Sequence, residues 1–213
     1  MLLVSGIDPG LSGAIAIYDQ ETDGLVAVWD IPTVKVQIGG STRKRLDMPE
    51  LRGMFDTMIV MDVKLICVER VQGYGGKEKN QSASAAFQFG EVFGRLMALA
   101  EEVAPVDTPA PSVWKMREKV STDAEAIVKK AEAEFPVQAM WFRGPKNGPL
   151  HDRAEAALLA RYAAHRIWPS LHSPAGLEVG QVLKLTTVTG SAIVTVTGTA
   201  SVAKSKRKAR KAK

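Results

Sequence analysis

Cysteine is almost absent from this sequence: Cys67 is the only one in 213 residues. A disulfide framework within one chain is therefore excluded, and a reducing compartment is the simplest expectation. Cys67 lies in the apolar run Leu65-Ile66-Cys67-Val68, so we expect it to be part of the hydrophobic core. The chain has three histidines and no Cys and His cluster with the spacing of a zinc site.

Long apolar runs are also missing. No stretch approaches the roughly 20 apolar residues that a membrane-spanning helix needs. Residues 1–8 lack the basic region and the apolar length of a secretion signal. We therefore expect a soluble, cytoplasmic protein with no membrane partner. Because 46% of the residues are hydrophobic and 24% are charged, one sizeable core is expected.

Positive charge is concentrated at the end of the chain. The net charge of +5 depends on seven basic residues with no acid among them: Lys204, Lys206, Arg207, Lys208, Arg210, Lys211 and Lys213. Without these seven, the 28 basic residues fall to 21, against 23 acidic residues. Electrostatics assigns such a tail to nucleic acid or another polyanion, and a solvated end that aids solubility is the alternative. The residues predicted to bind nucleic acid here are Lys206, Arg207, Lys208, Arg210 and Lys211.

The first third of the chain has the pattern of short strands. Apolar residues at 2–8, 14–18 and 24–31 predict three strands with short links, which favours an antiparallel meander. Residues 35–45 read as a polar loop whose Arg43, Lys44 and Arg45 either contact phosphates or are simply solvated. Asp47 and Glu50 form a capping box for a helix that ends near residue 61.

The remaining segments alternate between strands and helices. The almost continuously apolar run 64–70 predicts a central strand, and 103–106 a further one. Helices are expected at about 82–102, 112–120, 122–135 and 151–167, with Thr122 and Glu125 as a second capping box. This order predicts a mixed α/β sheet of five strands flanked by helices within a domain of residues 1–169. Residues 170–203 are rich in threonine and valine and predict a β-hairpin appendage, followed by a disordered basic tail at 204–213.

Four acidic residues stand beside apolar runs. Asp8 ends the first strand, Glu69 follows the run 65–68, and Asp152 and Glu155 precede an apolar helical run at 156–160. A buried carboxylate costs several kcal/mol unless it is paired or bound to a cation. Taken singly, each acid has a plain structural explanation: a turn residue, a strand-end surface charge, or acids favoured in the first turn of a helix.

Together the four carboxylates predict a metal site. Asp152 and Glu155, three residues apart, share one helical face. Oxygen ligands without a Cys or His cluster favour Mg²⁺, with Mn²⁺ as a substitute, and two ions about 3.5–4 Å apart would need several carboxylates. Such a site suits hydrolysis of phosphodiester bonds, with the carboxylates acting as ligands.

Three motifs carry a family resemblance. Gly6-Ile7-Asp8-Pro9-Gly10, then Val68-Glu69, then residues 152–160 resemble, in this order, the signatures of RuvC-type Holliday-junction resolvases. The similarity spans about residues 1–165 and includes Phe89-Gly90-Glu91 and the segment 111–115. It implies an RNase H-like fold, a homodimer, and Mg²⁺-dependent paired nicks across a four-way DNA junction, in the service of DNA recombination and repair.

Other site residues follow from the resemblance. Asp8, Glu69, Asp152 and Glu155 match the four family acids, with Glu155 at a position where aspartate is common. His151 directly precedes the third acid, and it is either a site participant or a helix-start residue. Tyr74, with Lys77 and Lys79 beyond it, is the candidate for an aromatic residue that enters the junction, although its offset differs from the family pattern. A catalytic lysine stays unassigned among Lys115, Lys119, Lys129 and Lys130.

Two other functions compete with a junction-cleaving nuclease. A non-catalytic protein that binds branched DNA would keep the fold and bind without cutting. An actin-like ATPase shares the Gly6-Ile7-Asp8 turn, but it would need a second phosphate loop and a second domain, and it would leave Asp152 and Glu155 unexplained.

Overall fold

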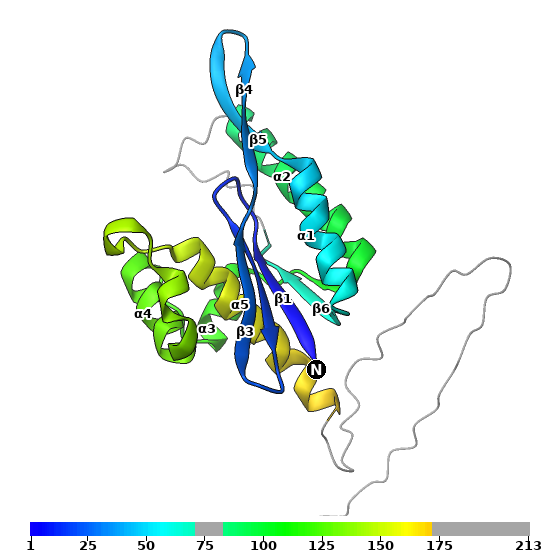
Figure 1. Cartoon of the computed structure of the whole chain (residues 1–213), viewed down its shortest axis with the longest axis vertical. Helices are drawn as coiled ribbons and strands as arrows, with labels where there is room; N and C mark the ends of the chain where they lie inside the picture. Colours follow the sequence, from blue (N-terminus) through cyan, green and yellow to red (C-terminus); the bar gives the residue numbers. More distant parts are fainter. Residues whose placement is uncertain (71–82, 172–213) are drawn as a thin grey trace, which may run out of the picture. The chain divides into compact units, whose positions relative to one another are not determined.

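The computed structural model describes residues 1–70 and 83–171, and its centre is a five-stranded mixed sheet (Figure 1). The strand order is β3-β2-β1-β6-β7. The first three strands form the expected antiparallel meander, while β6 and β7 continue the sheet parallel to β1. The predicted α/β class, a five-stranded mixed sheet flanked by helices, is confirmed. The strands are β1 (Leu3–Asp8), β2 (Ala14–Asp19), β3 (Gly24–Asp30), β6 (Leu65–Val68) and β7 (Val106–Asp107).

Helices cover both faces of this sheet. In Figure 1, α1 and α2 lie on one side of the strands and α3, α4 and α5 on the other. Each layer has its own buried apolar cluster against the sheet. The helices are α1 (Met48–Val60), α2 (Ala83–Val103), α3 (Pro111–Arg117), α4 (Ala124–Glu134) and α5 (His151–Leu171), with the 3₁₀ turns η1 (Pro136–Phe142) and η2 (Pro145–Asn147) between α4 and α5. No helix in these described ranges is long and apolar enough to cross a membrane.

The alternation of side chains along β1 decides which residues meet α5. Leu3 and Ile7 pack in the cluster with α1 and α2, whereas Val4 packs in the cluster with α5. Since successive side chains on a strand point to opposite faces, Asp8 shares the face of Val4. Cys67 on β6 is likewise buried in the α5 cluster, so the carboxylate two residues later faces the same layer.

Gly6 lets α5 approach β1 closely. A Cβ atom on Gly6 would lie 2.3 Å from both the Ala156 oxygen and the Ala160 nitrogen of the α5 backbone. Any side chain at position 6 would therefore push the helix away from the strand. The buried alanines of α5 complete this close approach, which brings Glu155 next to the sheet.

The largest departure from the predicted elements is the segment 33–46, within which we expected a polar loop at residues 35–45. The segment forms a two-stranded antiparallel hairpin, β4 (Thr33–Ile38) and β5 (Ser41–Leu46), outside the main sheet. Its turn uses Gly39 and Gly40, both with positive φ, and a pair of residues with positive φ suits the tight turns of hairpins. The loop prediction was wrong because these glycines were read as loop markers rather than as a turn.

Smaller differences concern helix ends. The cap of α4 is Asp123, whose side chain accepts a hydrogen bond from the Ala126 amide, so the predicted Thr122 cap was wrong. The α3 helix ends at Arg117, short of the predicted residue 120, and Lys119 has a positive φ. The predicted strand 103–106 is reduced to β7, because α2 continues through Val103. Residues 170 and 171, where the predicted appendage begins, belong to α5. The rest of the predicted appendage and the basic tail lie outside the described residues.

Candidate metal centre and active site

Three of the four predicted carboxylates converge where β1 and β6 end. Asp8 is the last residue of β1, Glu69 follows β6, and Glu155 lies on the first part of α5. One carboxylate oxygen from each lies within 4.8 Å of the other two. The Glu69 amide donates to the Ile7 carbonyl at 3.0 Å, which extends the β1–β6 pairing and fixes Glu69 beside Asp8.

The electrostatics of this group suit a cation. Burial, with the nearby charges of Glu155, Glu69 and Asp152, raises the pKa of Asp8 well above its usual value, and Lys115 offsets only part of this rise. The pKa of Glu69 is also raised, mainly by burial, although the Trp114 hydrogen bond and the Lys115 charge oppose the shift. A divalent cation bound between these carboxylates would stabilise their ionised forms against both burial and mutual repulsion.

Two residues of α3 support the carboxylates. Trp114 is fully buried, and its indole Nε1 donates to Glu69 Oε1 at 2.9 Å. Lys115 Nζ lies 2.8 Å from both carboxylate oxygens of Glu155 and 3.9 Å from Glu69 Oε1. Lys115 is thus the one of the four candidate lysines that these contacts bring to the carboxylates. Trp114 was not singled out from the sequence, although it stands inside the segment 111–115 that carried part of the resemblance.

Asp152 lies beside this group but outside it. Within the described residues, the group of three with mutually close ligand atoms excludes Asp152, although its charge contributes to the raised pKa of Asp8. His151 Nε2 lies 3.3 Å from Asp152 Oδ1, and its side chain is about half exposed. Arg153 makes a two-pronged contact with Asp30 at 2.6 and 2.7 Å, so the start of α5 is tied to the end of β3.

The donor chemistry fits a hard divalent ion. Carboxylate oxygens are the ligands that Mg²⁺ and Mn²⁺ prefer, and the described part of the chain places no sulfur or imidazole in the group of three. After Lys115 offsets one negative charge, the four acids still carry a surplus of negative charge when ionised. The residues present therefore fit a divalent ion held mainly by Asp8, Glu69 and Glu155, with Asp152 close by.

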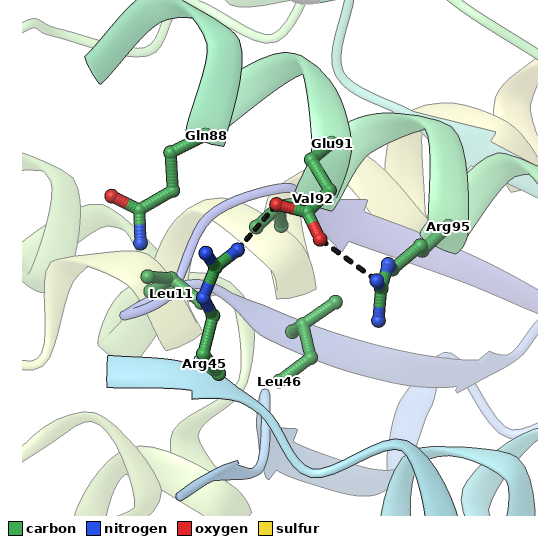
Figure 2. Close-up of a pocket in the computed structure, with 7 residues that line it drawn as sticks. All are labelled: Leu11, Arg45, Leu46, Gln88, Glu91, Val92 and Arg95. Carbon is green, nitrogen blue, oxygen red and sulfur yellow. Dashed lines mark hydrogen bonds and ion pairs between the residues drawn. The ribbon is translucent and has the colours of Figure 1, made fainter. Parts of the chain in front are cut away.

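A second region, the β4–β5 hairpin, carries three of the basic residues that were predicted to bind nucleic acid. Arg43 and Lys44 are exposed, while Arg45 is partly buried, with its guanidinium 2.5 Å from Glu91 of α2. A cavity of about 350 Å³ lies at the base of the hairpin (Figure 2). It is lined by Leu11, Arg45, Leu46, Gln88, Glu91, Val92 and Arg95. The other predicted nucleic-acid contacts lie outside the described residues: Tyr74, Lys77, Lys79, Lys206, Arg207, Lys208, Arg210 and Lys211.

Comparison with known proteins gives a mixed result. No protein-family model matches the sequence, and no curated protein matches it either. Among solved structures, the chain is similar to Thermus thermophilus RuvC, with 17% identity, a TM-score of 0.43, and coverage of 78% of this chain and 96% of that one.

Two further solved structures are similar at the same level. The Thermus thermophilus RuvC complex with a Holliday junction substrate matches with 17% identity and a TM-score of 0.44, covering 78% of this chain and 96% of that one. The fowlpox virus Holliday junction resolvase matches with 13% identity and a TM-score of 0.43, covering 78% of this chain and 99% of that one. The chain is thus similar, at low sequence identity, to solved structures of RuvC and of a viral Holliday junction resolvase.

Proposed function

We propose that this protein is a divalent-metal-dependent endonuclease that cleaves branched DNA, with the four-way junction as its main substrate. The observation that carries the proposal is the convergence of Asp8, Glu69 and Glu155 within 4.8 Å, in surroundings that raise the pKa of Asp8. Partly buried carboxylates this close together repel one another, and Lys115 offsets only part of that repulsion, so a divalent cation would stabilise the group. The branched substrate rests on the three sequence motifs that resemble RuvC-type resolvases.

The roles of the residues follow from their positions. Asp8, Glu69 and Glu155 would hold Mg²⁺ or Mn²⁺, with Asp152 as an additional ligand for a second ion. Bound divalent ions supply an activated water and charge stabilisation of the leaving 3′ oxygen. Trp114 fixes one Glu69 oxygen, which leaves the other oxygen free to act as a ligand. Lys115 orients the Glu155 carboxylate and adds a positive charge beside the position of the phosphate.

The wider context is also part of the proposal. Paired nicks on opposite strands of a junction require two active sites, so we propose that the protein acts as a homodimer. The single cysteine is buried, and burial raises the pKa of its thiol to about 12, so this thiol is unreactive. A chain without a disulfide framework suits a reducing compartment such as the cytoplasm, which we include in the proposal. His151, beside Asp152, would assist at the metal site only through that carboxylate.

The alternative is a protein that binds branched DNA without cutting it. The contact between Lys115 and Glu155 favours this alternative, because an internal cation can replace a metal ion at a carboxylate. Against it stands the charge balance, since one lysine cannot neutralise the three remaining acids around it. The two functions differ in a single observable, which is strand cleavage in the presence of a divalent ion.

The test compares a labelled, immobile four-way junction with a linear duplex of the same sequence, each with Mg²⁺, Mn²⁺ or EDTA. We expect symmetric nicks on the junction, little cleavage of the duplex, and no cleavage in EDTA. Equal cleavage of both substrates would show that the protein is a general nuclease without preference for junctions. Tight binding of the junction without cleavage in either metal would support the binding protein and overturn the proposal.

A further inference from the structure

The β4–β5 hairpin carries an unusual concentration of positive charge. Residues 33–46 contain Lys35, Arg43, Lys44 and Arg45 and no acidic residue. Lys35, Arg43 and Lys44 are exposed, and none of them forms an ion pair with an acid in the described ranges 1–70 and 83–171. Their charges are therefore available to a partner outside this part of the chain.

The register of the hairpin places cations on both of its faces. Lys35 lies directly opposite Lys44, whereas Val34 lies opposite Arg45 and Val36 opposite Arg43. Opposite residues on antiparallel strands share a face, so one face carries the two lysines and the other the two arginines. Like charges directly opposite one another are unfavourable in an isolated hairpin. A partner with negative charge on both sides of the ribbon would offset this cost.

The hairpin is held in place by α2. Gln88 donates to the Lys44 carbonyl at 3.2 Å, and Arg45 contacts Glu91, which also pairs with Arg95 at 2.7 Å. Figure 2 shows Glu91 between the two guanidinium groups, at the cavity beneath the hairpin. These contacts use the charge of Arg45 and leave the three exposed cations free. The hairpin is thus anchored at its base, and the exposed cations along its length can contact a partner.

The hairpin begins at the same end of the sheet as the carboxylates. Asp8 is paired with Ala14, and Ala14 in turn with Asp30 at the end of β3, three residues before β4 starts. In Figure 1 the hairpin extends beyond this end of the sheet. DNA held by the hairpin would therefore lie close to a strand bound at Asp8 and Glu69.

We propose that the β4–β5 hairpin is a duplex-binding arm that lies in the major groove of DNA next to the cleaved bond, with its two faces toward the phosphates of the two strands. A major groove about 12 Å wide admits a two-stranded ribbon. The Gly39-Gly40 turn presents no bulky side chain to the groove floor. Gln37, the only amide side chain on the ribbon, donates to Thr42 Oγ1 at 2.7 Å, so the exposed cations are the groups that the arm offers to the phosphates. The position next to a cleaved bond rests on the proposed function.

The test measures binding without cleavage, by fluorescence anisotropy in EDTA. The full chain is compared with the variant Lys35→Gln/Arg43→Gln/Lys44→Gln and with a matched control, Arg52→Gln/Lys129→Gln/Lys146→Gln. The control removes the same charge from exposed cations elsewhere on the described surface. Far-UV circular dichroism checks that both variants keep the fold. The probes are a linear duplex, a four-way junction and a single strand.

The expected result is a loss of duplex and junction affinity of about tenfold or more in the hairpin variant. The slope of log K against log salt should become shallower by about two to three units, since each phosphate contact contributes about 0.9. Affinity and slope equal to those of the control variant would overturn the proposal. An equal loss on the single strand would overturn the groove placement.

These readouts are independent of the proposed nuclease. If the wild type binds DNA and never cleaves it, the proposed function fails, while a loss of duplex binding in the hairpin variant still supports the arm. If the wild type cleaves junctions and the hairpin variant binds like the control, the arm fails alone.

Discussion

The carboxylate group at the end of β1 and the β4–β5 hairpin both gather charges of one sign, yet they do so in opposite settings. Asp8, Glu69 and Glu155 are largely shielded from water, and burial, together with the repulsion among these acids, raises the pKa of Asp8. Lys35 and Lys44 face each other in solvent, where screening keeps their repulsion small.

This difference indicates what each region binds. Buried charge of one sign needs a compact counter-charge at a defined point, which is what a divalent ion provides. Exposed charge spread along a ribbon matches an extended polyanion whose exact position is not fixed.

The largest effect is expected from Asp8→Asn. Loss of a ligand carboxylate should lower junction cleavage by about a thousandfold or more, since bound metal contributes several kcal/mol to the transition state. Junction affinity measured in EDTA should stay within about twofold of the wild type. Cleavage near the wild-type rate in Asp8→Asn would place the reaction elsewhere in the molecule.

Gly6→Ala should separate α5 from the sheet. The added methyl group would overlap the backbone of Ala156 and Ala160, so we expect a loss of about 3 kcal/mol in the free energy of unfolding. Chemical denaturation measures this loss. Gly53→Ala is the matched control, because the space around Gly53 is open and no strain is expected. Equal stability of the two variants would contradict the close approach of α5 and β1.

Lys115→Met should lower cleavage by about 10- to 100-fold, as is common for residues that orient metal ligands. Its Nζ holds both oxygens of Glu155, and an uncharged side chain of similar length cannot do so. Lys115→Arg should restore part of the activity, because it keeps the charge. The readout that separates positioning from stability is the Mg²⁺ concentration for half-maximal cleavage, measured well below the unfolding midpoint of each variant; it should rise in Lys115→Met.

The stability of the metal-free protein should depend on pH through Asp8. Its folded pKa is raised, so its favourable contribution is full at acidic pH and is lost as the pH rises through the folded pKa. Mn²⁺ needs the ionised carboxylates, so its stabilising effect should grow as the pH rises through the folded pKa of Asp8. Asp8→Asn should raise the metal-free Tm by about 2–4 °C, which corresponds to about 1 kcal/mol.

Calorimetric scans with EDTA or Mn²⁺ measure these shifts for both proteins. A Tm of Asp8→Asn below that of the wild type, in EDTA at neutral pH, would contradict this prediction. It would mean that the carboxylate stabilises the fold without a metal.

The smallest effect is expected in the hairpin. Lys44→Thr removes one of the two opposed lysines, which should raise the free energy of unfolding by about 0.2–0.5 kcal/mol at low salt. The gain should shrink in about 0.5 M salt, because screening already weakens the repulsion. A loss of stability in Lys44→Thr would show that Lys44 has a stabilising contact within the protein.

The strands of the sheet could be predicted from the sequence because each strand is marked by its own run of apolar residues. Apolar runs at 2–8 and 65–68 define strands, and an acid directly after each run marks Asp8 and Glu69 as unusual. Helix α1 was predictable from its capping residues, since Asp47 accepts from the Glu50 amide as expected. The family resemblance then ordered these segments into one fold.

What the sequence could not supply depends on contacts between distant residues. The choice of Lys115 among four lysines follows from the packing of α3 beside α5, which no local pattern encodes. The hairpin was missed although Val34, Val36 and Ile38 alternate with polar residues, because its strands are half exposed and do not join the main sheet. The convergence of Glu155 with Asp8 depends on Gly6, whose role appears only when α5 is placed against β1.

The most direct measurement of the central claim is the anomalous scattering of Mn²⁺ in crystals of the full chain grown with junction DNA. The account predicts a peak bounded by the carboxylates of Asp8, Glu69 and Glu155, and the loss of this peak in Asp8→Asn. A peak elsewhere in the protein, together with Mn²⁺-dependent cleavage in solution, would contradict the assignment of the metal centre.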